Sequence, residues 1–199
     1  MKSQNPFFTA MIAISAALGG LFVVLSVLLG HGNTLAHLCF YILIGGGILG
    51  LLAPRTAFLF WIVACGYSDL LKRLTIVFGE VSRNDLLYIL GITPVMFAGI
   101  VISLVVGGLT GAYTVRMSHW LMFIAGVGLM LLTGVLYAIE AGGAPTAAAQ
   151  GIANGGLYSL LPFVVPVLFP YPKEMLRILR FTLWVFLPVA LYGILQQVQ

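Results

Sequence analysis

The sequence predicts an all-α, polytopic membrane protein, a bundle of about six or seven transmembrane helices. Two properties of the 199-residue chain lead to this prediction: 61% of its residues are hydrophobic and only 7% are charged, whereas charged residues make up about 25% of a typical soluble domain. In addition, its apolar runs are long enough to cross a hydrocarbon core about 30 Å thick. A β-barrel would instead show alternating segments of about ten residues, and these runs are unbroken.

The apolar runs place the spans in order along the chain. The first, Phe7–Gly30, has about 24 residues, which indicates an uncleaved span because the apolar region of a signal peptide has only about 7–15. Pro54 ends the second, since proline cannot continue the helical hydrogen-bond ladder. A shorter run, Thr56–Gly66, is either a short span or one arm of an interfacial hairpin. The other expected spans are Leu35–Ala53, Leu86–Gly108, Trp120–Ile139, Ala147–Phe169 and Ile178–Leu195.

Lysine and arginine residues favour one of these two interpretations, because in short loops both prefer the cytoplasmic side. Seven spans with a cytoplasmic N-terminus place Lys72, Arg73 and Arg83 outside and the other six basic residues inside. If Thr56–Gly66 does not span, five of the basic residues lie inside and four lie outside. The uneven division favours seven spans.

Residues 67–85 read YSDLLKRLTIVFGEVSRND and hold six of the 14 charged residues of the chain. Their acids and bases are spaced to pair at i+3 and i+4 along a helix. We therefore expect an amphipathic helix near residues 68–83 that lies in the membrane surface. The apolar residues recur at the spacing of one helix face: Leu70, Leu71, Leu74, Val77, Phe78 and Val81.

Lys72, Arg73 and Arg83 are the candidate residues for binding an anionic headgroup or a diphosphate. Ammonium and guanidinium groups both suit phosphate oxygens. The plainer alternative is a solvated connector whose charges pair with one another. A second basic stripe, in PYPKEMLRILR (170–180), is typical of a positive-inside anchor; binding of an anionic lipid is the alternative.

Other features of the sequence exclude several kinds of site. Cys39 and Cys65 are isolated and the three histidines lack metal-ligand spacing, so no metal or cofactor is expected. The chain lacks the P-loop, H-E-x-x-H and G-x-S-x-G patterns, and it has no basic cluster interleaved with aromatics for nucleic acid. Gly151 and Gly155, at GxxxG spacing, predict close helix packing. Glu140 is expected at a span boundary, where an acid of intramembrane function is the alternative.

Two segments resemble a known family. GGLYSLLPFVVPVLFPYPKEMLRILRFTLWVFLPVALYGILQ (155–196) resembles the middle of bacterial O-antigen ligase and O-antigen polymerase-like membrane proteins. GYSDLLKRL is similar to the charged stretch after an early span in exopolysaccharide polymerase relatives. The resemblance implies that residues 1–199 form a single transmembrane domain, the N-terminal half of a longer protein of surface polysaccharide assembly in the bacterial cytoplasmic (inner) membrane.

The resemblance also implies the chemistry and the partners. Family members transfer glycans from an undecaprenyl-diphosphate carrier and use Arg and His residues of a large extracytoplasmic loop. No positions here match that loop, so the catalytic residues are unknown. Lys72, Arg73 and Arg83 would assist diphosphate binding from the outside, and the implied partners are membrane lipids, the lipid-linked glycan and a second membrane chain that supplies the missing half.

The alternative is a small integral membrane transporter or accessory subunit without glycan chemistry. A transporter is expected to place polar groups at mid-membrane depth on broken helices. Most charged residues of this sequence fall instead at the ends of the expected spans, which favours the first hypothesis.

Overall fold

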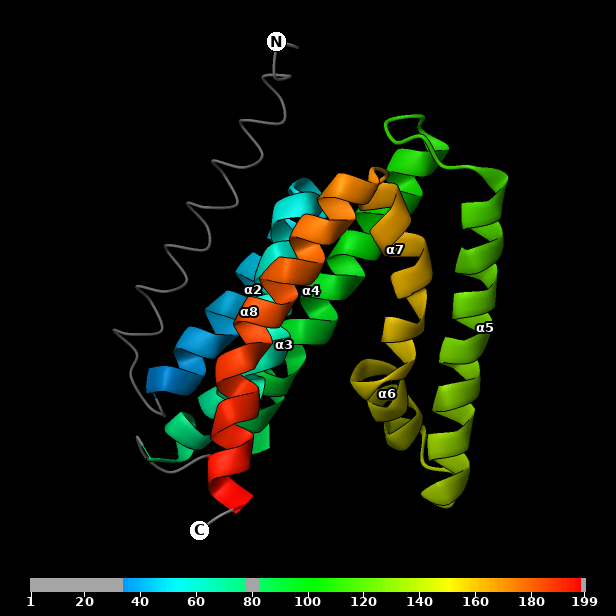
Figure 1. Cartoon of the computed structure of the whole chain (residues 1–199). Helices are drawn as coiled ribbons and strands as arrows, with labels where there is room; N and C mark the ends of the chain where they lie inside the picture. The colour runs from blue at the N-terminus through cyan, green and yellow to red at the C-terminus, as the bar shows by residue number, and fades with distance from the viewer. Residues whose placement is uncertain (1–33, 78–82, 198–199) are drawn as a thin grey trace.

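The computed structural model describes residues 34–77 and 83–197, and all regular elements of these two ranges are helices. The all-α prediction is therefore confirmed for this part of the chain. Successive passes run in alternating directions, with α6, η1 and α7 together forming one pass (Figure 1). The elements are α2 (Thr34–Leu52), α3 (Pro54–Val77), α4 (Arg83–Leu109), α5 (Met117–Glu140), α6 (Pro145–Asn154), the 3-10 helix η1 (Gly156–Leu160), α7 (Leu161–Leu168) and α8 (Pro172–Gln197).

Two of the described helices are long and apolar enough to cross a membrane: α4 over Leu86–Leu109, and α5. The segment from α6 to α7 makes a third if it counts as one span with a bend of 47°. Length and composition thus support two or three spans in the described ranges, and they do not support six or seven. The apolar part of α2 is short (Leu38–Leu52), and α3 and α8 each carry several charges. The expected span Phe7–Gly30 lies outside the described residues.

The expected start of an amphipathic helix near residue 68 is wrong. α3 begins at Pro54 and continues without a break through Gly66 to Val77, so the apolar run and the charged stretch belong to one helix. Gly66 is a packing position, because a Cβ there would lie 3.3 Å from Val185 Cγ1 of α8. The last residues of the expected helix, 78–82, lie outside the described ranges, and α4 begins at Arg83.

Glycines bring the backbones of α2 and α4 into contact. A Cβ at Gly50 would lie 2.6 Å from the carbonyl oxygen of Met96, and a Cβ at Gly99 would lie 2.6 Å from the carbonyl oxygen of Gly47. Atoms cannot approach so closely, so both positions require glycine. Such close approach increases van der Waals contact between membrane helices, where the hydrophobic effect contributes little.

Glycines also join α5 to the segment that follows it. A Cβ at Gly151 would lie 2.6 Å from Cγ of Tyr137, whereas a Cβ at Gly155 would meet open space. The predicted close packing is therefore confirmed at Gly151 and wrong at Gly155. Away from this seam α5 exposes large apolar side chains, including Ile124 (64%) and Ile139 (68%). A surface of this kind matches lipid hydrocarbon, and it indicates an integral membrane protein.

The main core lies between α3, α4 and α7. Phe97 and Phe163 are completely buried. The ring of Trp61 packs against three others, with centroid distances of 5.3 Å to Phe58, 5.0 Å to Phe97 and 5.6 Å to Tyr158. These contacts fix the first half of α3 against α4 and leave its opposite side facing α8.

Candidate functional site

The ends of the helices divide the basic residues into two groups. α3, α5 and α8 all begin at one end of the bundle (Figure 1). Ring contacts join this end, at 5.6 Å between Phe58 and Phe169 and at 5.9 Å between Trp120 and Phe163. We call it the base-rich end, because Arg55, Arg116 and Lys173 lie where these helices begin, and Arg177 and Arg180 follow in the first half of α8.

The three predicted binding residues belong to the opposite end. Lys72 and Arg73 lie in the last turns of α3, and Arg83 is the first residue of α4. Lys72 is partly buried. The side chains of Arg73 and Arg83 lie outside the described residues, so the shared phosphate site stays a prediction. Glu140 is exposed at the end of α5, as expected of a span boundary.

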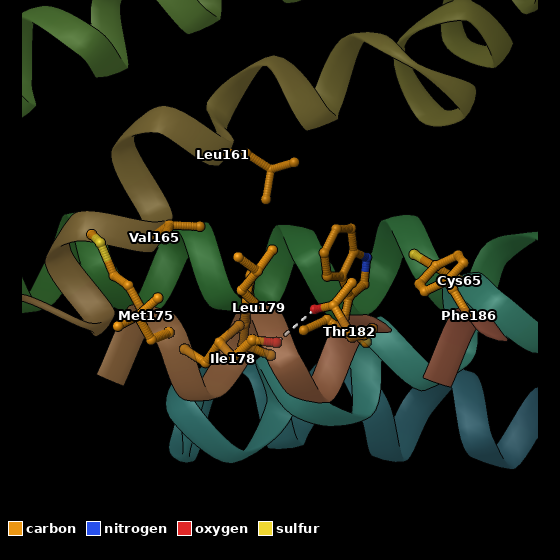
Figure 2. A pocket seen from close by; sticks show the side chains of 12 residues that line it. Cys65, Leu161, Val165, Met175, Ile178, Leu179, Thr182 and Phe186 are labelled. Carbon is orange, nitrogen blue, oxygen red and sulfur yellow. Dashed lines mark hydrogen bonds between the residues drawn. The ribbon is translucent and has the colours of Figure 1, made fainter. Parts of the chain in front are cut away.

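A cavity of about 510 Å³ lies between α3, α7 and α8 (Figure 2). On α3 it is lined by one helix face, on which Phe58, Trp61 and Cys65 recur at i, i+3 and i+7. On α8 it is lined by another face, which includes Ile178, Leu179, Thr182 and Phe186. Leu161 and Val165 of α7 form the third wall. The lining is almost entirely apolar.

The cavity exists because α3 and α8 are held together at two separated places. At one place Phe169, just before α8, contacts Phe58; at the other, Val185 and Phe186 of α8 approach Gly66. Between these contacts neither helix has side chains that fill the space. The periodicity of the sequence could have indicated the two helix faces. It does not indicate that a cavity lies between them.

Two of the residues that line the cavity carry a polar side-chain group. Thr182 Oγ1 donates a hydrogen bond of 2.9 Å to the carbonyl oxygen of Ile178 within its own helix (Figure 2). The Nε1 atom of Trp61 is buried and has no hydrogen-bond partner in the described part of the chain. Sequence reasoning missed Trp61, since an aromatic residue in an apolar run gives no functional signal by itself.

Two polar side chains of the bent segment from α6 to α7 form hydrogen bonds with its neighbours. Tyr158 Oη donates to Thr93 Oγ1 of α4 at 3.1 Å. Ser159 Oγ lies 2.6 Å from the carbonyl oxygen of Gly126 and 2.7 Å from that of Gly156. These bonds secure the segment to its neighbours.

Neither metal ligation nor similarity to known proteins indicates a function for this chain. Within residues 34–77 and 83–197, no three His, Cys, Asp or Glu side chains come together as metal ligands. Comparisons of the chain with protein-family models, with curated proteins and with solved structures find no match. The resemblance to O-antigen ligases therefore stays a hypothesis, and the cavity between α3, α7 and α8 is the strongest structural evidence about function.

Proposed function

We propose that this integral membrane protein binds a membrane lipid, with one apolar chain of the lipid inside the cavity between α3, α7 and α8. The observation that carries the proposal is the apolar lining of a cavity of about 510 Å³, which falls within the roughly 300–1,000 Å³ of small-molecule sites. A polar substrate would lose its hydrogen bonds to water there without replacement, so an apolar chain fits best.

The charges near the cavity favour an anionic headgroup. Arg55 precedes Phe58 by three residues, so it lies on the same side of α3, one turn nearer the base-rich end. Its side chain is exposed, and Glu174 is the one acid among the described residues in the first turns of α3, α5 and α8. A basic helix end of this kind attracts anionic lipid, at about 1 kcal/mol for each base near the surface.

Arg55→Gln is expected to weaken the binding of a fluorescent phosphatidylglycerol to the protein in neutral detergent. A direct contact between an exposed guanidinium and a phosphate is worth about 1 kcal/mol, so we expect the Kd to rise about fivefold at low salt and less at high salt. Arg116→Gln is the matched control, because Arg116 is an exposed base at the same end that lies just before α5, a helix that does not line the cavity. Equal losses in both variants would contradict a role for Arg55, and no binding by the unmodified protein would contradict the proposed function.

The base-rich end is proposed to face the cytoplasm, in accordance with the positive-inside rule. The test uses single cysteines at exposed positions in a chain without Cys39 and Cys65. Thr114→Cys, between α4 and α5, is expected to react with an impermeant maleimide only after cells are permeabilised. Ala141→Cys, just after α5, is expected to react in intact cells. Reaction of both from the same side would contradict the crossing of the membrane by α5.

From the sequence resemblance we further propose that lipid binding serves surface polysaccharide assembly in the bacterial cytoplasmic membrane. Lys72, Arg73 and Arg83 would then contact the diphosphate of the lipid-linked glycan from outside. A count of six or seven membrane spans is part of this proposal. The alternating helix directions support this count (Figure 1), as do exposed apolar residues of α8 such as Trp184. Unchanged surface polysaccharide in a strain that lacks the chain would contradict it.

A transporter is the second candidate, because one observation favours it. The segment from α6 to α7 is bent by 47° at its break, and broken helices form the binding sites of many transporters. The hydroxyl groups of Tyr158 and Ser159, however, are bonded to the neighbouring helices α4 and α5. These bonds fix the bent segment in place, and the cavity remains the better site.

A further inference from the structure

One end of the cavity between α3, α7 and α8 lies toward the base-rich end of the bundle. Both α3 and α8 begin there, and Phe58 and Met175 are the lining residues nearest to these two helix starts (Figure 1). Arg55 lies one turn before Phe58 on α3. An anionic headgroup at Arg55 therefore directs its acyl chain into the cavity between Phe58 and Met175, toward the opposite end.

The ring of Phe186 closes this opposite end. Phe186 and Cys65 are the last lining residues of α8 and α3, and Figure 2 shows both at one end of the labelled side chains, with Met175 at the other. Cζ of Phe186 lies 3.8 Å from the position that a Cβ would take on Gly66, the residue after Cys65. The ring therefore reaches from α8 to the backbone of α3.

The distance between the two ends limits the length of chain that fits. Phe186 follows Met175 by eleven residues, which corresponds to roughly 16 Å along the axis of α8. An extended acyl chain advances roughly 1.25 Å for each carbon, because its single bonds of about 1.5 Å form a zigzag. The cavity therefore accepts roughly 13 carbons before the chain meets the ring of Phe186.

We infer that Phe186 sets the length of the bound acyl chain, and that the site selects a lipid with a medium chain, such as lauroyl, over one with a longer chain. This inference rests on the proposed lipid binding. A palmitoyl chain exceeds the estimated length, so it must displace the ring or bend out of the cavity. Displacing a packed side chain costs free energy, whereas a lauroyl chain reaches its end before the ring.

The test compares two lipids that differ only in the length of the chain. The probes are radiolabelled lauroyl and palmitoyl lysophosphatidylglycerol, and their binding to the full chain is measured by equilibrium gel filtration in neutral detergent. Affinities are compared as mole fractions of lipid in the micelle, because both chains are in an apolar environment before they bind. The usual cost of overpacking corresponds to a preference for lauroyl of at least about fivefold.

Phe186→Ala is expected to abolish this preference, so that both lipids bind about equally. The substitution removes six ring carbons, whereas palmitoyl needs room for only four carbons more than lauroyl. Val185 keeps its contact with Gly66 in this variant, at 3.3 Å from the position of a Cβ there. The ratio of the two affinities is measured within each variant, so a smaller folded fraction does not alter it.

Trp184→Ala is the matched control. Trp184 is an aromatic residue of the same helix that is 73% exposed and does not line the cavity. Its removal is expected to leave the preference for lauroyl unchanged. An equal loss of preference in Trp184→Ala and in Phe186→Ala would overturn the role of Phe186.

A crosslinking experiment locates the end of the chain in the unmodified protein. The probe is lauroyl lysophosphatidylglycerol with a photoreactive diazirine at the end of its chain. After illumination, mass spectrometry is expected to find the label on Cys65 or Phe186. Label confined to exposed residues of α8 such as Leu183 and Trp184 would overturn the inference.

The outcomes distinguish this inference from the proposed function. Equal or tighter binding of palmitoyl by the unmodified protein would overturn the selection of medium chains and leave lipid binding in place. An unchanged preference for lauroyl in Phe186→Ala would overturn the role of Phe186. Binding of neither lipid would overturn both the inference and the proposed function.

Discussion

Gly50→Val is expected to lower the stability of the folded protein strongly, while Gly45→Val, on the same helix, is tolerated. A Cβ at Gly50 would lie 2.6 Å from the carbonyl oxygen of Met96 and 2.9 Å from the amide nitrogen of Ile100. Both are backbone atoms of α4, so relief requires the two helices to separate. Overpacking usually costs about 1–3 kcal/mol, and we expect at least the upper value here, a large part of a typical stability of about 5–15 kcal/mol.

The matched control at Gly45 tests whether this cost comes from the crossing with α4. A Cβ at Gly45 would meet no atom within 4 Å, and the same valine is added there to the same helix. The measurement is the apparent Tm of each variant in detergent, read from the fraction that remains monodisperse after heating. If Gly50→Val melts together with Gly45→Val, α2 and α4 do not pack in the way described.

The positions of the two clearest spans could be predicted because apolar length is a local property of the sequence. The expected span Leu86–Gly108 agrees with the apolar part of α4 at Leu86–Leu109. The expected span Trp120–Ile139 likewise lies within α5. In both cases the composition of one stretch is sufficient, because a helix of this length satisfies its own backbone and needs no information about its neighbours.

The path of α3 could not be predicted from local patterns. The charged residues after Gly66 resembled the start of a surface helix, but the helix continues because α8 packs closely against that glycine. A glycine in a packed crossing and a glycine at a helix end look alike in a single sequence. Only the contact with Val185, more than 100 residues away along the chain, distinguishes them.

The cavity was beyond sequence reasoning for a related reason. Trp61 and Thr182 belong to helices that are far apart in the chain, and each lies on an ordinary apolar face. A cavity depends on the distance between such faces, which is set by contacts elsewhere, here at Phe58 and Gly66. The resemblance directed attention to bases at the opposite end of the bundle, whereas the cavity begins one turn from Arg55.

Thr182→Phe is expected to reduce the affinity for an acyl lipid at least about tenfold, which corresponds to about 1.4 kcal/mol. The larger side chain would occupy the space that we assign to the acyl chain. The hydroxyl that is lost bonds only to the Ile178 carbonyl of its own helix, and such a bond adds little to helix stability. The folded protein is therefore expected to keep its Tm or to gain from the filled cavity.

The measurement is the quenching of Trp61 fluorescence by a lipid with a brominated acyl chain, in a protein that carries Trp120→Phe and Trp184→Phe. Leu183→Phe is the matched control, because Leu183 is the next residue of α8 and is 64% exposed. Lipid that merely surrounds the bundle contacts this exposed surface. Equal quenching in Thr182→Phe and in the control would therefore indicate surrounding lipid, whereas a loss confined to Thr182→Phe requires a chain inside the cavity.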